Sequence, residues 1–192
     1  MRNAEATRER ILDAAMDEFS AYGIAGARVD RIAKTAGCNK NLIYIYFENK
    51  ETLFTTVLQK NLNRAFEEIP FSPDDLPAFA VKVFDFAMSH PDVMRLLMWA
   101  NLEQRTDNPP ERISAHEEKI QKIGRAQGEG RVGSALSPSF LLTAVMTLST
   151  AWAATNPFGP SLDPDSAKNQ GALREYVASA VAMMVRTDRP VR

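Results

Sequence analysis

The sequence predicts an all-α protein of about nine helices, with a three-helix domain at the N-terminus and a larger helical domain after it. Apolar residues recur at steps of three and four residues in one segment after another, which is the spacing of a single helix face. Glycine and proline residues separate these segments, and both residue types end helices. Two short segments within residues 27–47 lie on either side of a tight glycine turn, which predicts a helix-turn-helix motif.

The composition is that of an ordinary globular protein. The chain has 192 residues, of which 45% are hydrophobic and 24% charged, and a chain of this length buries roughly 70% of its unfolded surface. The polar N-terminus lacks the apolar core of a signal peptide, and no apolar run reaches the ~18 residues of a membrane span. The single cysteine excludes an intrachain disulfide, which fits a reducing cytoplasm. We therefore expect a cytoplasmic protein without a membrane partner.

The net charge of −1 is unevenly distributed along the chain. Residues 1–64 carry ten Lys and Arg against eight Asp and Glu, whereas residues 65–115 carry four against nine. The mildly basic N-terminal part is therefore the one expected to approach nucleic-acid phosphates. Binding to DNA should depend on a few Lys and Arg side chains at particular positions and not on a large basic patch.

The first helix is expected over residues 4–22. Its apolar line consists of Ile11, Ala15, Phe19 and Tyr22, and Gly23 closes it. This face should cover the back of the two short helices and hold them in one orientation.

The two short helices have the pattern of a DNA-reading motif. The first places four apolar residues on one narrow face: Val29, Ile32, Ala33 and Ala36. Gly37 ends it, because glycine accepts the left-handed conformation that a helix end needs, and Asn39 can cap the next helix with its side-chain oxygen. That second helix, residues 40–47, turns Ile43 and Phe47 inward. Its other face shows amide, ammonium and phenol groups, which suit the major groove of DNA.

Eight residues at the turn and on this outer face are the candidates for DNA contact: Arg28, Asn39, Lys40, Asn41, Leu42, Tyr44, Tyr46 and Lys50. Asn41 can make a bidentate contact to an adenine, and Lys40 can reach guanine acceptors or a phosphate. Leu42 could pack on a thymine methyl group. Lys50, at the start of the next helix, is expected to bind a phosphate. Tyr46 could bind a phosphate from the inner edge or serve only in the core.

Residues 27–54 resemble the DNA-binding domain of the TetR/AcrR family of transcriptional regulators. The matching positions, in register, are Val29, Ile32, Ala33, Ala36, Gly37, Tyr44, Tyr46, Phe47, Lys50 and Leu53. The resemblance covers about the first 65 residues. It implies that Tyr44 is the family's DNA-contacting tyrosine, and that the C-terminal domain binds a ligand and forms the dimer.

Asp30, Arg31 and Cys38 are among the positions that depart from the family pattern. The family has Arg and then Asp where this chain has Asp30 and then Arg31, so a guanine contact made by relatives at the first position is lost. Asp30 could instead accept a hydrogen bond from a cytosine amino group, or Arg28 could take over a base or phosphate contact. Arg31 is interpreted as a structural ion-pair partner. Cys38 stands where the family has a small apolar residue, and it is read as a packing thiol, with a redox switch as the alternative.

The fourth helix is expected from about Lys50 to Glu68, with one apolar face along its length. In the family, its tilt changes the spacing of the two DNA-reading heads. Pro70 and Pro73 then break the chain. The predicted division is therefore a helix-turn-helix domain at 1–50, a connecting helix at 51–68 and a C-terminal domain at 69–192.

The C-terminal domain reads as further helices. Ser137 and Pro138 form a helix start, with serine as the cap and proline in the first turn. The helix after them is apolar on several sides, so it should be buried both inside the subunit and against another surface. With the last helix it is the candidate dimer interface, formed by Leu141, Ala144, Val145, Leu148, Val177, Ala180, Val181 and Met184. The alternative is that these residues complete the core of one chain.

Methionine and aromatic side chains in this domain could line a pocket for an apolar ligand. The candidates are Phe84, Met88, Met94, Met98, Trp99, Met146 and Trp152. The same residues at helical spacing could also be ordinary core. Few buried-looking charges lie among them, which suggests a neutral or hydrophobic effector.

These observations lead to one principal hypothesis: a ligand-responsive, homodimeric transcriptional repressor that binds a palindromic double-stranded DNA operator and is released by a small effector. Activation in place of repression stays open. The alternative class is a small helical enzyme or ligand carrier with an incidental helix-turn-helix. An enzyme needs paired acid–base or nucleophilic groups, but His90 and His116 have no spacing that suggests triad or metal chemistry. We therefore expect no catalytic residues, no metal and no cofactor.

Overall fold

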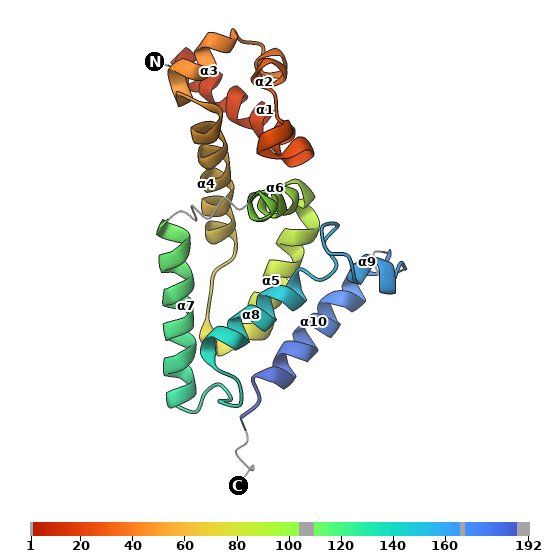
Figure 1. Ribbon diagram of the computed structural model, residues 1–192. Coiled ribbons are helices and arrows are strands. Elements are labelled where there is room, and N and C mark those ends of the chain that lie inside the picture. Colours follow the sequence, from red (N-terminus) through yellow and green to blue (C-terminus); the bar gives the residue numbers. More distant parts are fainter. Residues whose placement is uncertain (1, 104–109, 166–167, 188–192) are drawn as a thin grey trace. The chain divides into compact units, whose positions relative to one another are not determined.

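The computed structural model describes residues 2–103, 110–165 and 168–187 (Figure 1). Within these ranges the chain forms ten α-helices and one short 3-10 helix, and no strand, which confirms the all-α prediction. The chain divides into two compact units. Among the described residues, unit 1 joins residues 2–65 to residues 92–103, and unit 2 joins residues 66–91 to residues 110–165 and 168–187.

Unit 1 is built on α1 (Arg2–Gly26), which packs against α2 (Val29–Ala36). The other helices of this unit are α3 (Lys40–Phe47), most of α4 (Lys50–Glu68) and α6 (Pro91–Leu102). Ile11, Ala15 and Phe19 are fully buried, as predicted. The Phe19 ring meets Phe54 of α4 edge to face, with 5.2 Å between centroids. Tyr22 does not belong to this buried line: it is 52% exposed, and the prediction that placed it there is wrong.

A tight turn at Gly23 distorts α1 three residues before its end. Gly23 has φ 66° and ψ −177°, a backbone conformation that only glycine adopts readily. A Cβ atom at this position would lie 2.6 Å from Glu103 Oε1 and 2.8 Å from the Trp99 ring. Trp99 Nε1 also donates a hydrogen bond to the Ser20 carbonyl, at 3.2 Å. Helix α6 therefore packs on this turn, and it belongs with the N-terminal unit although the sequence division placed its residues in the C-terminal domain.

Unit 2 contains η1 (Pro73–Asp75), α5 (Leu76–Ser89), α7 (Pro110–Gly128), α8 (Pro138–Ser149), α9 (Gly159–Leu162) and α10 (Gln170–Met184). Helices α8 and α10 both pack against α5, and α7 packs against α8 and η1. The predicted start of α8 is confirmed, because the Ser137 hydroxyl accepts a hydrogen bond from the Phe140 N–H and Pro138 is in the first turn. Asp75 and Asn169 cap α5 and α10 in the same way.

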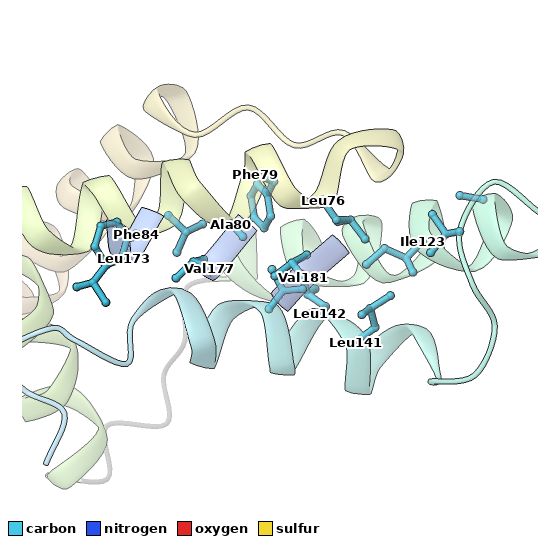
Figure 2. Close-up of a cluster of buried hydrophobic side chains, with 14 residues drawn as sticks. Leu76, Phe79, Ala80, Phe84, Ile123, Leu141, Leu142, Leu173, Val177 and Val181 are labelled. Carbon is cyan, nitrogen blue, oxygen red and sulfur yellow. The ribbon is translucent and has the colours of Figure 1, made fainter. Parts of the chain in front are cut away.

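The core of unit 2 forms where α5, α7, α8 and α10 meet (Figure 2). Its members include Leu141 and Val145 of α8 and Val177 and Val181 of α10, each at most 1% exposed. A side chain buried to this degree within one chain has no surface left for a second chain. These four residues were predicted at the dimer interface, and for them the prediction is wrong. A helix that is apolar on several sides does not reveal from sequence which side faces inward.

Candidate nucleic-acid interface

Helix α2 is fixed on α1 by its apolar face. Val29, Ile32, Ala33 and Ala36 are all buried, as predicted. Arg28 precedes the helix in an extended conformation and leaves its first amide groups without helical partners. The Glu18 carboxylate of α1 accepts the Arg28 N–H at 2.7 Å, so a side chain from another helix caps α2.

Glu18 also pairs with Arg31. The carboxylate is 8% exposed and accepts two hydrogen bonds from Arg31 Nε, at 2.8 and 3.0 Å. The guanidinium lies over the ring of the exposed Tyr22, 4.4 Å from its centroid, in a cation–π contact. Burial raises the pKa of Glu18, but the hydrogen bonds from Arg31 and Arg28 outweigh it and the net pKa lies below its usual value. The interpretation of Arg31 as a structural ion-pair partner is confirmed.

The turn between α2 and α3 has the predicted chemistry. Gly37 ends α2 with φ 63° and ψ 42°, in the left-handed region. Asn39 caps α3, because its Oδ1 accepts the Asn41 N–H at 2.8 Å. Cys38 is half-buried and its N–H donates to the Ala33 carbonyl. Arg10 of α1 donates from Nε to the Ala36 carbonyl, which fixes the turn against α1.

Helix α3 presents Asn41, Tyr44 and the apolar Ile45 outward. Ile43 and Phe47 are buried, as predicted, and they hold the helix on the unit. Asn41 and Tyr44 are exposed, while Leu42 and Tyr46 are half-buried. The Tyr46 hydroxyl donates to the Ala4 carbonyl at 3.4 Å. Asn41 and Tyr44 are therefore exposed to solvent, whereas Tyr46 has a hydrogen-bond partner within the unit.

Two of the candidate cations are held by neighbouring groups. Lys40 Nζ lies 2.9 and 3.0 Å from the two carboxylate oxygens of Asp30. Lys50 Nζ donates to the carbonyls of Ile24 and Ala27, at 2.6 and 3.3 Å. Lys50 therefore ties the start of α4 to the chain after the Gly23 turn, and its predicted contact with a phosphate stays a prediction.

A shallow concavity of about 430 Å³ opens where α2, α3 and the start of α4 meet. Seven polar side chains from these three helices and the residues just before them line it: Arg28, Asp30, Lys40, Tyr44, Asn49, Lys50 and Glu51. Arg28 and Asp30 are exposed there. This surface offers donors and the carboxylate acceptors of Asp30 and Glu51 to a ligand that carries both kinds of group, as the edge of a base pair does.

The residues predicted to bind an effector are divided between the two units. Phe84 is buried in the core of unit 2, and Met88 and Trp152 are packed half-buried against that core. Met146 of α8 is 37% exposed. The other three, Met94, Met98 and Trp99, lie on α6 in unit 1. Trp152 Nε1 is buried without a hydrogen-bond partner among the described residues.

Sequence reasoning missed two residues that position the motif. Glu18 directly follows the charged Asp17 within the first helix. Glu103 follows α6, and its Oε2 and Oε1 accept the N–H groups of Ile24 and Ala25, at 3.2 and 3.1 Å. Neither role has a local signal, since each depends on a partner 10 to 79 positions away.

Two classes of site are not found in the part of the chain that the structure describes. No group of three or more His, Cys, Asp and Glu side chains is arranged to hold a metal ion there. In the same residues, no helix has both the length and the apolar character needed to cross a membrane.

The fold and this interface define a helix-turn-helix DNA-binding protein. Residues 11–57 match the model of the family described as bacterial regulatory proteins, tetR family, and residues 75–182 match a tetracyclin repressor-like C-terminal domain. The chain belongs to the TetR family of transcriptional regulators.

Similar proteins agree with this assignment. The chain is 37% identical over 159 residues to the HTH-type transcriptional repressor SCO4008 of Streptomyces coelicolor, covering 81% of this chain and 82% of that one. It is 30% identical over 135 residues to the HTH-type transcriptional repressor NicS of Pseudomonas putida, covering 67% and 59%. The crystal structure of the transcriptional regulator SCO4942 from Streptomyces coelicolor superposes with a TM-score of 0.80 at 34% identity, covering 96% of this chain and 99% of that one.

Proposed function

We propose that this chain is a homodimeric repressor that binds a palindromic operator in the cytoplasm and is released by a small neutral or hydrophobic effector. The observation that carries the proposal is the outer face of α3, where Asn41 and Tyr44 are exposed although Ile43 and Phe47 anchor the helix. A rigid helix with exposed amide and phenol groups fits the major groove. Two relatives carry repressor in their names, which supports repression as the outcome of binding.

The dimer is supported by apolar side chains that unit 2 leaves exposed. On α10, Tyr176 and Met183 are 67% and 66% exposed, and they share a helix face because they are seven residues apart. On α8, Phe140 is 60% exposed. Exposed apolar side chains on adjacent helices mark an interaction surface. We place the two-fold contact on this outer face of α8 and α10, with Ala144, Leu148, Ala180 and Met184 as its half-buried edge.

The effector is supported by the unpartnered indole N–H of Trp152. A buried donor without a partner costs free energy, and a ligand with an oxygen acceptor would satisfy it. Trp152 lies against the apolar core of unit 2, so the same ligand would bury its apolar part there. Effector binding would then shift the population towards a form that no longer fits the operator.

The test is a binding titration with the duplex upstream of the chain's own gene. The chain should bind this duplex more tightly than a scrambled duplex of equal length, at both low and physiological salt. Equal affinity for the two duplexes at every salt concentration would contradict the proposal, because it would leave only the non-specific phosphate term.

The effector is tested in the same titration. Neutral aromatic and aliphatic compounds that raise the melting temperature should also lower the affinity for the operator, and Trp152→Phe should weaken this effect. Compounds that stabilise the protein and leave operator affinity unchanged would contradict the effector proposal and leave DNA binding intact.

A further inference from the structure

Asp30 and Lys40 form a donor–acceptor pair on the DNA-facing surface. Lys40 is the first residue of α3 and Asp30 lies in the first turn of α2, and Nζ is 2.9 Å from Oδ1 and 3.0 Å from Oδ2. The Asp30 side chain is 74% exposed and the Lys40 side chain 42% exposed. Both line the same concavity as Tyr44, which follows Lys40 by one helical turn.

A carboxylate at this place is unfavourable for DNA binding in general. The duplex carries one negative charge per ~1.7 Å of its axis, so an exposed carboxylate near the groove is repelled by phosphates. An exposed ion pair also contributes little to stability. Asp30 therefore assists binding only where the duplex offers it a hydrogen-bond donor. In the major groove those donors are the amino groups of cytosine and adenine.

The hydrogen-bonding groups of Lys40 and Asp30 are complementary to those that a G·C base pair exposes in the major groove. A G·C pair shows the guanine acceptors O6 and N7 next to the cytosine N4 amino donor. The O6 and N4 atoms are hydrogen-bonded to each other, so they are separated by about 2.9 Å, the usual N–H···O length. Lys40 Nζ and the Asp30 oxygens have the same separation and the opposite hydrogen-bonding roles. An ammonium over O6 and N7 and a carboxylate over N4 can thus be satisfied together.

An A·T pair fits less well. Its adenine N6 donor lies beside the adenine N7 acceptor, which repels the carboxylate, and its thymine O4 lies beside a methyl group, which crowds the ammonium. Beside its N4 amino donor, cytosine has only the C5–H group, which does not repel a carboxylate. The hydrogen-bonding pattern of the pair therefore favours G·C.

We propose that Asp30 and Lys40 act as one unit that reads a single G·C base pair in each half of the operator, with Lys40 on the guanine and Asp30 on the cytosine. This inference rests on the proposed operator binding and names the base pair that this part of the site recognises. It makes Asp30, on α2, a specificity-determining residue alongside the outer face of α3.

The experiment starts from the operator that the wild-type chain selects from a randomised duplex pool. One G·C pair per half-site should be required, and its replacement by C·G, A·T or T·A should weaken binding on the order of tenfold. Asp30→Ala and Lys40→Ala should each make the affinities for these four duplexes converge at that same position. Asp30→Ala should also bind random duplex more tightly than wild type at low salt, because a charge that repels phosphate is gone.

Asp13→Ala is the matched control. Asp13 is equally exposed, at 76%, and pairs with Lys60 on α4 at 3.4 Å, away from the concavity. This variant should keep the wild-type base preference. Wild-type chain on an operator carrying 7-deazaguanine at the assigned position provides a measurement that no folding defect can affect, and its affinity should fall several-fold.

Three results would overturn the inference. The two substitutions could relax different base pairs, they could change the affinity for all duplexes by one factor, or 7-deazaguanine could bind as well as guanine. In each case the wild-type chain still selects an operator, so the proposed function stands. If the wild-type chain selects no sequence at all, the proposed function fails and this inference fails with it.

Discussion

At the scale of single residues, Glu18 connects the first helix to the DNA-reading motif. Its carboxylate is buried and accepts hydrogen bonds from the Arg28 N–H and the Arg31 side chain. Replacing the carboxylate by an amide leaves the Arg31 guanidinium without its counter-charge and leaves one oxygen to accept from both Arg28 and Arg31. A buried group that loses a charged hydrogen-bond partner costs more than the bond itself contributed.

Glu18→Gln should therefore lower the free energy of unfolding by roughly 2 kcal/mol at pH 7. The folded-state pKa of Glu18 lies below the ordinary value of 4.5, so its stabilising contribution is complete above that pH and is lost as the pH falls through the folded pKa. The difference between wild type and variant in urea denaturation should be largest at pH 7 and should close below pH 4.5. Asp17→Asn, which changes an exposed neighbour, should alter stability by less than about 0.5 kcal/mol. A pH-independent difference would contradict this account.

Gly23 gives a second prediction at this scale. Gly23→Ala should destabilise the chain by roughly 1–3 kcal/mol, because alanine is strained at φ 66° and ψ −177° and its Cβ meets Glu103 and Trp99. Gly128→Ala at the end of α7 is the control, since a Cβ there meets nothing within 4 Å. Thermal denaturation followed by circular dichroism compares the two. An equal midpoint for both variants would show that the turn tolerates a side chain.

At the scale of elements, the eight residues of α3 include buried side chains that anchor the helix and exposed side chains that are proposed to contact DNA. Asn41→Ala and Tyr44→Phe change exposed groups, so each should weaken operator binding on the order of tenfold and leave the melting temperature within error of wild type. Ile43→Ala empties a buried site and should cost about 2–5 kcal/mol of stability. Operator affinity and melting temperature are measured on all three. The division is wrong if the exposed substitutions unfold the protein or leave affinity unchanged.

The elements also show how far the sequence predicts this structure. The bounds of α3 and α4 and the caps at Gly37 and Asn39 match prediction, because they depend on periodicity and on residues within one or two turns. The association of α6 with unit 1 could not be predicted, since it depends on Glu103 meeting amides 78 and 79 positions earlier. The hydrogen bonds from Lys50 to the Ile24 and Ala27 carbonyls could not be predicted either, because these partners lie 26 and 23 positions earlier in the sequence.

At the scale of the whole molecule, the proposal requires two chains. Tyr176→Lys and Met183→Lys place charges on the exposed face of α10 and should shift the chain towards monomer, with operator affinity falling in parallel. Leu162→Lys is the control, because Leu162 is 80% exposed on α9 and lies off the proposed contact. Sedimentation velocity at micromolar concentration measures the outcome. A wild-type chain that sediments only as monomer would contradict the dimer. Variants of α10 that stay dimeric would contradict the placement of the two-fold contact on this helix.

The most direct measurement is methylation interference on the selected operator, combined with the stoichiometry of the complex. The account expects two chains per duplex and two blocks of major-groove contacts, related by a two-fold axis and separated by about one helical turn or more. The Asn41→Ala variant should lose contacts in both blocks at once. A single block, contacts confined to the minor groove, or a complex of one chain per duplex would contradict the central claim that a symmetric pair of α3 helices reads the operator.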